Sequence, residues 1–328
     1  MAPVFQSGAA CAKSPSRPVP SFQELHLMNN SIGFIGLGVM GTPMALNLAR
    51  SGVPLAVWSR SNTHYDTLRE AGATVAESPD TLFSSCKTVF LMLAHEAAID
   101  EVLGRGTPLF DRRVEDRLIV NMSTTSPEYS RALADAIEAS QGQYVEAPVS
   151  GSRKPAEAGQ LVAMVAGAPD QVEAVRELIK PMCRDSLVCG DVPGALTMKL
   201  AVNLFLITMV TGLAEATHFA QCHGIDLSQF ARALNSGPMA SDVSRVKIDK
   251  LVKQDFSVQA AITDVLKNSR LVAEAARGIG IASPLLDVSH ALYGETEALG
   301  HGPLDMVAVI HAIAQRTDQA AGKMPPAP

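Results

Sequence analysis

Aromatic side chains are scarce in this chain: they make up 5% of its 328 residues, and only one of them is a tryptophan. A hydrophobic core must therefore be built from aliphatic side chains. The hydrophobic share of 47% against a charged share of 18% supplies enough of them and excludes a wholly disordered chain. The length suits one large domain or two ordinary ones.

Basic runs and long apolar runs are both missing. The net charge is −6, and no cluster of lysine or arginine offers a surface for phosphates, so we expect no nucleic-acid partner. The most apolar stretch, Leu200–Ala214, has only fifteen residues and contains Asn203. A membrane-spanning helix needs about 20 apolar residues. We therefore predict a buried core helix here and no membrane association.

Cysteines are few and scattered, with no CxxC pair and no His/Cys spacing of a metal site, so we predict no metal. An odd, dispersed set is typical of a reducing compartment, and we expect a cytoplasmic protein. Residues 1–30 are rich in Ser and Pro and lack the apolar run of a secretory signal. We interpret them as a disordered extension or as a start upstream of the natural one at Met28. The five cysteines are Cys11, Cys86, Cys183, Cys189 and Cys222.

Short apolar runs alternate with helical patterns from Ser31 to about Gly190, which is typical of a parallel sheet with helical crossovers. After Gly194 only long helical patterns follow. We predict an α/β Rossmann-type dinucleotide-binding domain over residues 31–193, an all-α domain over 194–321, and a flexible tail over 322–328. The expected strands are IGFIGLG, PLAVWSR, TVFLMLA, RLIVNMS and QYVEAPV, with LVAMVAG and SLVCG near the sheet edge.

A GxGxxG motif follows the first expected strand and opens a helix, where a dinucleotide pyrophosphate would bind. NAD sites usually end the second strand with an acid that binds the ribose 2′-hydroxyl. Here the strand ends in Ser59-Arg60-Ser61, and an arginine can pair with a 2′-phosphate. We therefore expect NADP(H) to be preferred and NAD(H) to be possible, unless Arg60 is only a solvated charge. The motif residues are Gly36, Leu37, Gly38, Val39, Met40 and Gly41.

Four separated segments resemble one family, the β-hydroxyacid dehydrogenases, the group of 3-hydroxyisobutyrate dehydrogenase, tartronate semialdehyde reductase and the glyoxylate/succinic semialdehyde reductases. GFIGLGVMGTPMALNLARSG resembles its opening motif, and VNMSTTSP its STxSP segment. EAPVSGSRKPAEAGQL resembles its substrate loop, and MKLAVN carries its catalytic Lys and Asn. The resemblance covers about Ile32 to Asp305.

The resemblance implies a helical second domain like that of 6-phosphogluconate dehydrogenase, a cleft between the domains, and a homodimer or homotetramer. It assigns proton transfer to Lys199, substrate orientation to Asn203, substrate contact to Ser123 and carboxylate binding to Ser150 and Gly151, with Ser152 beside them. The remaining residues predicted to contact cofactor are Met92, Leu93 and Thr124.

The chemistry explains why such a lysine would be useful. Hydride transfer belongs to the nicotinamide, but the protein must accept or supply the hydroxyl proton. Lysine can do so when burial draws its pKa down toward about 7–8. Lys199 has only uncharged neighbours, and Asn203 follows one helical turn later on the same face. The alternatives are that Asn203 bonds neighbouring backbone and that Ser123 and Ser150 are ordinary turn residues.

The chain departs from the family pattern at three places. Ser152 replaces the second glycine of the substrate loop, and Pro193 and Ala195 replace the paired glycines before the catalytic lysine. Thr263 stands where the family has a lysine, and Lys267 one turn later is a possible substitute. Two further residues have open roles. His95 either borders the nicotinamide or is a solvated loop residue, and Asp264 either anchors Lys199 or starts a helix.

The predicted function is an NADP(H)-dependent oxidoreductase that acts on the CH–OH group of a small β-hydroxy acid, or on its semialdehyde. Its partner is then a small-molecule carboxylate. Two alternatives are an imine reductase on the same scaffold and a non-catalytic NADP(H)-binding sensor or structural protein. The retained Lys199 argues against both, because imine reductases usually carry another residue at that position and a sensor needs no proton donor.

Overall fold

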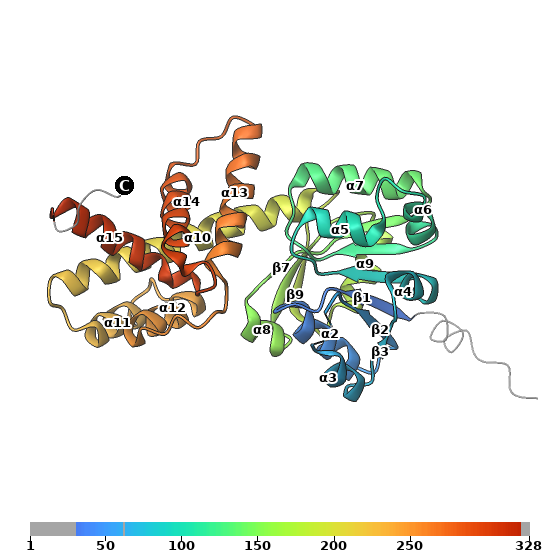
Figure 1. Ribbon diagram of the computed structural model, residues 1–328, viewed down its shortest axis with the longest axis horizontal. Coiled ribbons are helices and arrows are strands. Elements are labelled where there is room, and N and C mark those ends of the chain that lie inside the picture. The colour runs from blue at the N-terminus through green and yellow to red at the C-terminus, as the bar shows by residue number, and fades with distance from the viewer. Residues whose placement is uncertain (1–30, 62, 323–328) are drawn as a thin grey trace, which may run out of the picture.

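The structure is a computed structural model and describes residues 31–61 and 63–322. Our predictions for residues 1–30 and for the end of the tail, residues 323–328, lie outside the described residues. Figure 1 shows two parts, a sheet-containing part and a helical part, with helix α10 (Gly194–Cys222) running from the first into the second.

The first part contains a six-stranded sheet in which every pair of neighbouring strands is parallel, in the order β3-β2-β1-β4-β5-β6. This order places the carboxyl ends of β1 and β4 side by side at the point where the strand order reverses, which is where such sheets bind ligands. The predicted Rossmann-type fold is confirmed. The strands are β1 (Ile32–Ile35), β2 (Leu55–Trp58), β3 (Thr74–Val75), β4 (Thr88–Leu91), β5 (Leu118–Asn121) and β6 (Gln143–Glu146).

Helices cover both faces of this sheet, so its central strands are apolar on both sides. On β1, Phe34 packs in the core beneath α2 and α9, while the next residue, Ile35, packs in the core on the opposite face. Phe90 and Leu91 alternate in the same way on β4. One face carries α2 (Gly41–Arg50), α3 (Tyr65–Glu70), α8 (Arg153–Glu157) and α9 (Pro169–Leu178), and the other α4 (Pro79–Ser85), α5 (Glu96–Leu103), α6 (Leu109–Val114) and α7 (Pro127–Ala139).

A second, three-stranded sheet corrects two sequence predictions. The run QYVEAPV, expected as one strand, divides into β6 and β7 (Val149–Ser150), because Pro148 has no N–H to continue a ladder. The runs LVAMVAG and SLVCG form β8 (Leu161–Val165) and β9 (Cys183–Val188). Strand β8 pairs with β7 and β9 pairs with β8, so neither extends the edge of the first sheet. A single bridge between Glu146 and Ala166 joins the two sheets.

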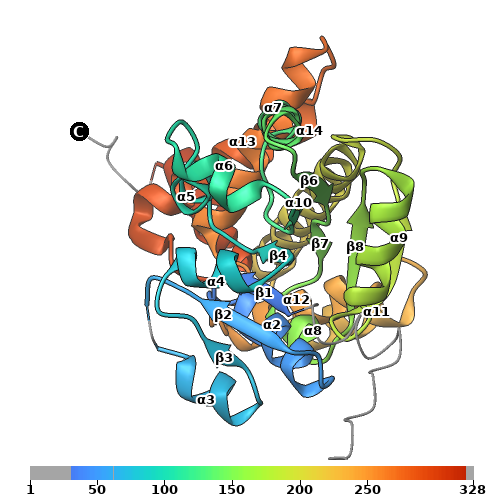
Figure 2. The ribbon, with the colours of Figure 1, turned by 90° about the vertical axis from the view of Figure 1, so that its right-hand side faces the viewer.

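The second part is helical throughout, as predicted. Helix α10 packs against each of the later α-helices, and their apolar faces share one core in which Tyr293 is fully buried. In Figure 2, which looks at the molecule from the sheet-containing end, α10 lies near the centre of the view. These elements are α11 (Leu227–Ser236), α12 (Asp242–Lys253), α13 (Ile262–Gly278), α14 (Pro284–Thr296), a π-helical turn (Glu297–His301), a 3-10 turn (Met306–Val309) and α15 (Ile310–Ala320).

Among the described residues, α10 is the one helix long and apolar enough to cross a membrane by length and composition. Its buried residues include Ile207, Val210 and Ala214, which pack into the core of the helical part. The helix therefore occupies the position predicted for it from the sequence, that of a central core helix.

An ion pair lies inside this helical core. Lys247 on α12 donates to both carboxylate oxygens of Asp305 at 2.8 and 3.0 Å, and both side chains are buried. Asp305 also accepts the backbone N–H groups of Gln259, Ala260 and Val307. Burial lowers the pKa of Lys247, and the charge of Asp305 opposes that shift. The pair ties α12 to the segment before α13 and to the start of the 3-10 turn at Met306–Val309.

We predict that Asp305→Ala lowers the free energy of unfolding by about 3–5 kcal/mol, because it leaves a buried ammonium without its partner. Asp249→Ala is the matched control, since its pair with Lys253 is more than half exposed and should contribute about 0.2–1 kcal/mol. Urea unfolding of both variants measures the difference, and equal losses would contradict the buried-pair account.

Candidate active site

The turn between β1 and α2 has the geometry of a dinucleotide site. Gly36 has a positive φ of 103°, and a Cβ there would lie 2.1 Å from the carbonyl oxygen of Met92. A Cβ on Gly41 would lie 1.8 Å from the carbonyl oxygen of Gly36, whereas Gly38 faces open space within 4 Å. The outer glycines are thus required by packing. The middle one leaves room for a pyrophosphate to approach the backbone.

The start of α2 is free to bind an anion. No side chain caps it. The N–H of Thr42 donates to the carbonyl of Gly38 at 3.0 Å and Pro43 has no N–H, which leaves the N–H of Gly41 at the positive end of the helix dipole. The helix begins at Gly41, with Thr42 donating its hydroxyl to the carbonyl of Leu37 at 2.8 Å. Val39 is exposed and Met40 half-buried at the same turn. The turn fits the pyrophosphate of NAD(P).

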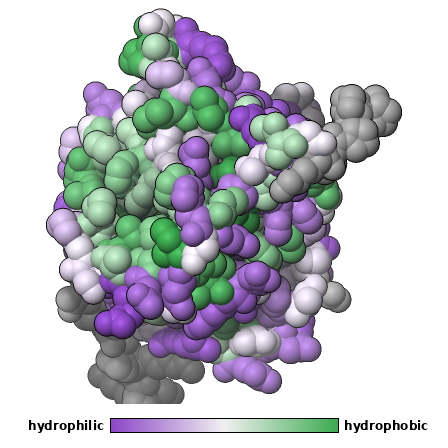
Figure 3. All heavy atoms as spheres, turned by 90° about the vertical axis from the view of Figure 1, so that its left-hand side faces the viewer, coloured by the Kyte–Doolittle hydropathy of each residue, from purple (hydrophilic) through white to green (hydrophobic). Residues whose placement is uncertain are grey.

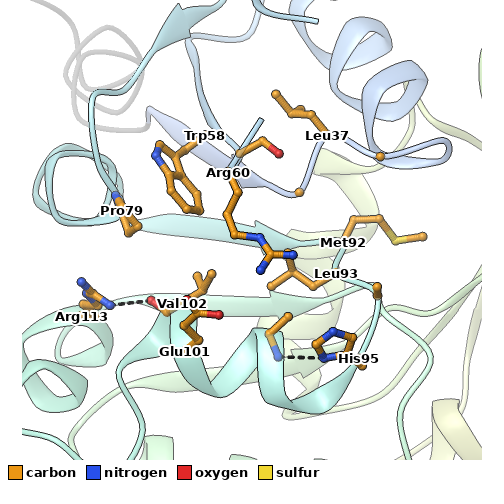
Figure 4. A pocket seen from close by; sticks show the side chains of 15 residues that line it. Leu37, Trp58, Arg60, Pro79, Met92, Leu93, His95, Glu101, Val102 and Arg113 are labelled. Carbon is orange, nitrogen blue, oxygen red and sulfur yellow. Dashed lines mark hydrogen bonds between the residues drawn. The ribbon is translucent and has the colours of Figure 1, made fainter. Parts of the chain in front are cut away.

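A cavity of about 290 Å³ opens beside this turn, between the carboxyl ends of β1, β2 and β4 (Figure 4). Of the cofactor residues predicted from the sequence, Val39, Met40, Gly41, Ser61 and Thr124 do not line it. Those that do are Gly36, Leu37, Gly38, Ser59, Arg60, Met92 and Leu93.

Arg60 extends into the cavity from the end of β2, as Figure 4 shows. The backbone of Ser59 is held by Tyr65, whose hydroxyl accepts from its N–H at 2.9 Å and donates to its C=O at 2.7 Å. Among residues 31–61 and 63–322, no acidic side chain forms an ion pair with Arg60. A second arginine in the lining, Arg113, is engaged by Asp80 at 2.9 Å. Among the described lining residues, Arg60 is thus the arginine that forms no ion pair.

The lining includes residues that the sequence reasoning missed, above all Trp58, the last residue of β2. Its position two residues before Arg60 was the available signal, because a strand end at this edge of the sheet faces the cofactor. His95 also lines the cavity, and its Nδ1 accepts the N–H of Ala98 at 3.1 Å, which caps α5. In the structure His95 therefore combines a capping role with a position at the cavity wall.

Lys199 and Asn203 lie one turn apart on α10 and are both buried, with exposed fractions of 8% and 3%. Burial lowers the pKa of Lys199 to about 8. Within the described part of the chain, the Nζ of Lys199 makes no hydrogen bond, and the Nδ2 donor of Asn203 is buried without an acceptor. A buried donor without an acceptor, as the Nδ2 of Asn203 is, costs free energy unless a ligand supplies an oxygen.

The predicted substrate loop lies against this helix. Strand β7 contacts α10, and the loop continues through Gly151 into α8. Gly151 has a φ of +133°, and a Cβ there would lie 2.6 Å from the Leu161 side chain. Ser150 is half-buried, and Ser152 occupies the N-cap position of α8 without bonding the helix through its side chain. The backbone here leaves Ser150 and Ser152 available to an anionic group.

Ser123 is fully buried beneath the cofactor cavity. Its Oγ accepts the N–H of Leu93 at 2.8 Å, and its own N–H donates to the side chain of Asn121 at 3.0 Å. The hydroxyl thus braces the loop after β4 against the loop after β5. A direct substrate contact by Ser123 stays a prediction.

Lys267 reaches from the helical part to the cofactor side. Its Nζ donates to the backbone carbonyls of Ala94 at 2.5 Å and Thr124 at 3.1 Å, which follow β4 and β5. Burial lowers its pKa, and Asp264 opposes that shift. Lys267 therefore joins the helical part to the loops after β4 and β5, and its role as a substitute for a lysine at Thr263 stays a prediction. Asp264 itself is exposed in the first turn of α13 and makes no bond to Lys199.

One of the two changed positions before Lys199, Ala195, has a structural explanation. A Cβ on the retained Gly194 would lie 2.1 Å from the carbonyl oxygen of Cys189, so this glycine is required. Ala195 is fully buried against Met164 and Ala166, where its methyl group fills the core. No group of three or more potential metal ligands gathers anywhere in the described ranges.

Comparison with known proteins agrees with this geometry. The NAD binding domain of 6-phosphogluconate dehydrogenase matches residues 31–190, and the NAD-binding domain of NADP-dependent 3-hydroxyisobutyrate dehydrogenase matches residues 194–313. Glyoxylate/succinic semialdehyde reductase 1 of Arabidopsis thaliana is 31% identical over 86% of this chain and 98% of its own length. The chloroplastic reductase 2 of the same plant is 30% identical over 86% and 79%.

A solved structure has the same fold. The 3-hydroxyisobutyrate dehydrogenase of Salmonella typhimurium superposes with a TM-score of 0.79 at 22% identity, covering 86% of this chain and 99% of that one. Fold, cofactor turn and sequence matches together define an NAD(P)-binding oxidoreductase of the class that acts on CH–OH groups. The chain belongs to the β-hydroxyacid dehydrogenase family.

Proposed function

We propose that this enzyme interconverts a small β-hydroxy acid and its semialdehyde, with NADP(H) as cofactor and Lys199 as the general acid and base. The observation that carries the proposal is the buried Lys199 amine, whose pKa lies at about 8. An amine with that pKa is present in both protonation states near neutral pH, as a reversible proton carrier requires.

The neighbouring residues support the same chemistry. The bound nicotinamide supplies or accepts the hydride. Lys199 accepts the hydroxyl proton when the alcohol is oxidised and returns one when the carbonyl is reduced. The free Nδ2 of Asn203 donates to the substrate oxygen and holds it beside Lys199. The loop around Ser150, Gly151 and Ser152 receives the substrate carboxylate, through backbone N–H groups and two hydroxyls.

The relatives narrow the substrate class. Two curated relatives at 30–31% identity are named as glyoxylate/succinic semialdehyde reductases, which reduce small aldehydes that carry a carboxylate. We propose the same class of substrate here and reduction as the favoured direction. A panel of small hydroxy acids and semialdehydes, followed by nicotinamide absorbance, identifies the substrate. If the enzyme turns over no compound of the panel but still binds the cofactor, an imine substrate or a non-catalytic role is favoured.

We predict that oxidation speeds up as the pH rises through about 8, because only the neutral amine of Lys199 accepts a proton. Reduction falls over the same range, since it needs the ammonium. Lys199→Ala should lower kcat by about 10²–10⁴-fold, the usual contribution of a general acid or base. Nicotinamide binding, measured by fluorescence, should not change. Unchanged turnover in this variant would remove Lys199 from the mechanism.

The preference for NADP(H) rests on Arg60. Its guanidinium can pair bidentately with a 2′-phosphate, and β2 ends without the acid that would bind a 2′-hydroxyl. The NADP-dependent description of the family matched by residues 194–313 supports this assignment.

Replacing Arg60 should change the choice of cofactor. We predict that Arg60→Ala raises the KM for NADPH about tenfold or more, the equivalent of about 1.4 kcal/mol, and alters the KM for NADH little. Arg69→Ala is a control, because that arginine is exposed and pairs with Asp66 away from the cavity. Equal effects on both cofactors, or a native preference for NADH, would exclude the Arg60 assignment.

A homo-oligomer formed through the helical part is also proposed. Figure 3 views the helical end of the molecule and shows apolar side chains gathered among polar ones. Among residues 31–61 and 63–322, the large exposed apolar side chains other than Val39, Leu187 and Val188 belong to the helical part. Several of them cluster where α13 leads into α14: Ile279, Ile281, Leu285 and Val288.

We predict a solution mass at least twice the chain mass of 34.6 kDa, measured by light scattering. Leu285→Asp should shift that mass toward the monomer, since a desolvated carboxylate has no partner in an apolar interface. Val188→Asp, on the sheet-containing part, serves as the control. A monomeric native chain would exclude the oligomer.

A further inference from the structure

Glu146, the last residue of β6, is a fully buried carboxylate that the proposed chemistry does not use. Its Oε2 accepts the backbone N–H groups of Ala195 and Leu196, both at 3.1 Å. Its Oε1 accepts the hydroxyl of Ser130 on α7 at 2.5 Å. One side chain of the sheet therefore fastens the first turn of α10, the helix that carries Lys199.

Burying the Glu146 carboxylate costs free energy. Burial raises the pKa of Glu146, while the hydrogen bonds from Ser130, Leu196 and Ala195 partly oppose that shift. Within the described residues, no lysine or arginine forms an ion pair with it. What balances the burial is the pair of helix N–H groups, which would otherwise be unsatisfied, together with the positive end of the α10 dipole.

The same carboxylate connects α10 to the floor of the cofactor cavity. Ser130 bonds the hydroxyl of Tyr144 at 2.7 Å, and Tyr144 accepts from Asn121 at 3.0 Å. Asn121 in turn accepts the N–H of Ser123, whose Oγ holds Leu93. A chain of hydrogen bonds, buried except for the last one at Leu93, thus runs from the start of α10 to the wall of the cofactor cavity.

We propose that Glu146 is a positioning residue, which fixes α10 against the sheet so that Lys199 and Asn203 face the cofactor side at the right depth. This inference rests on the proposed role of Lys199. Lys199 follows Leu196 by less than one helical turn, so a displacement of the first turn displaces its amine directly. Reaction rates are sensitive to this, because a misplacement of about 1 Å can cost about 10²-fold.

Glu146 acts through position and not as a counter-charge. The depressed pKa of Lys199 has burial as its cause, so the carboxylate does not restore the ammonium form. The titratable groups that face Glu146 are Tyr144 on its own strand and Cys189 after β9. Burial raises the pKa of both, and the charge of Glu146 raises it further. The pKa of the Lys199 amine can therefore stay low while the Glu146 carboxylate holds its helix in place.

Two substitutions distinguish a positioning role of Glu146 from an effect of its charge. Glu146→Ala removes the acceptor and admits water, so kcat should fall at least about 10-fold while KM changes little. The pKa of Lys199 should then rise from about 8 toward the ordinary lysine value. Glu146→Gln keeps an oxygen for both helix N–H groups and can donate to Ser130. Its kcat and its Lys199 pKa should stay close to those of the native enzyme.

The pKa of Lys199 is read in two independent ways. One is the pH profile of kcat, and the other is the rate at which Lys199 is acylated as the pH varies, followed by mass spectrometry. The second needs no turnover, so it tests Glu146 even if the proposed reaction is wrong. Glu173→Ala, an exposed glutamate on α9, is the control for both readings.

Each outcome decides the inference. A Glu146→Ala enzyme with native kcat and native Lys199 pKa would overturn the inference. A Glu146→Gln enzyme as impaired as the alanine variant would overturn it too, because the site would then require the charge of Glu146 and not only its hydrogen bonds. If the alanine variant does not fold, Glu146→Asp replaces it, because the shorter side chain does not reach both N–H groups. If Lys199→Ala retains native turnover, the proposed function fails separately from the positioning role.

Discussion

The proposed chemistry of this enzyme depends on the burial of one amine, that of Lys199. Lys199 sits on a helix that is apolar on nearly all sides, and burial brings its pKa to about 8. A charged amine is expensive in such a place, and nothing in the described structure pairs with it. The side chain is buried because α10 is central and packs against each of the later α-helices.

The sheet supplies the complementary half of the site. In the turn after β1, close backbone contacts allow only glycine at positions 36 and 41, whereas Gly38 is open to a ligand. The loops after β4 and β5 are held from below by Ser123 and from the helical side by Lys267. The loop that forms a wall of the cofactor cavity and helix α10, which carries Lys199, are therefore joined by hydrogen bonds, although they belong to different parts of the chain.

Much of this could be predicted from the sequence, because the signals were local. The GxGxxG turn, Arg60 just after the second strand, and Lys199 with Asn203 one turn later each lie within a short segment. Long-range pairing carried no such signal: β7, β8 and β9 form their own sheet, and Glu146 meets α10 across 49 residues. A single acid inside the apolar run YVEAPV was the available hint, since buried charges need partners.

The most direct test is to titrate the Lys199 amine itself in the folded protein, by NMR of isotopically methylated lysines with Lys199→Arg as the assignment control. The account predicts a midpoint at about 8. A midpoint near the ordinary lysine value of about 10.4 would contradict it, because an amine that stays protonated through neutral pH does not serve as the base for alcohol oxidation.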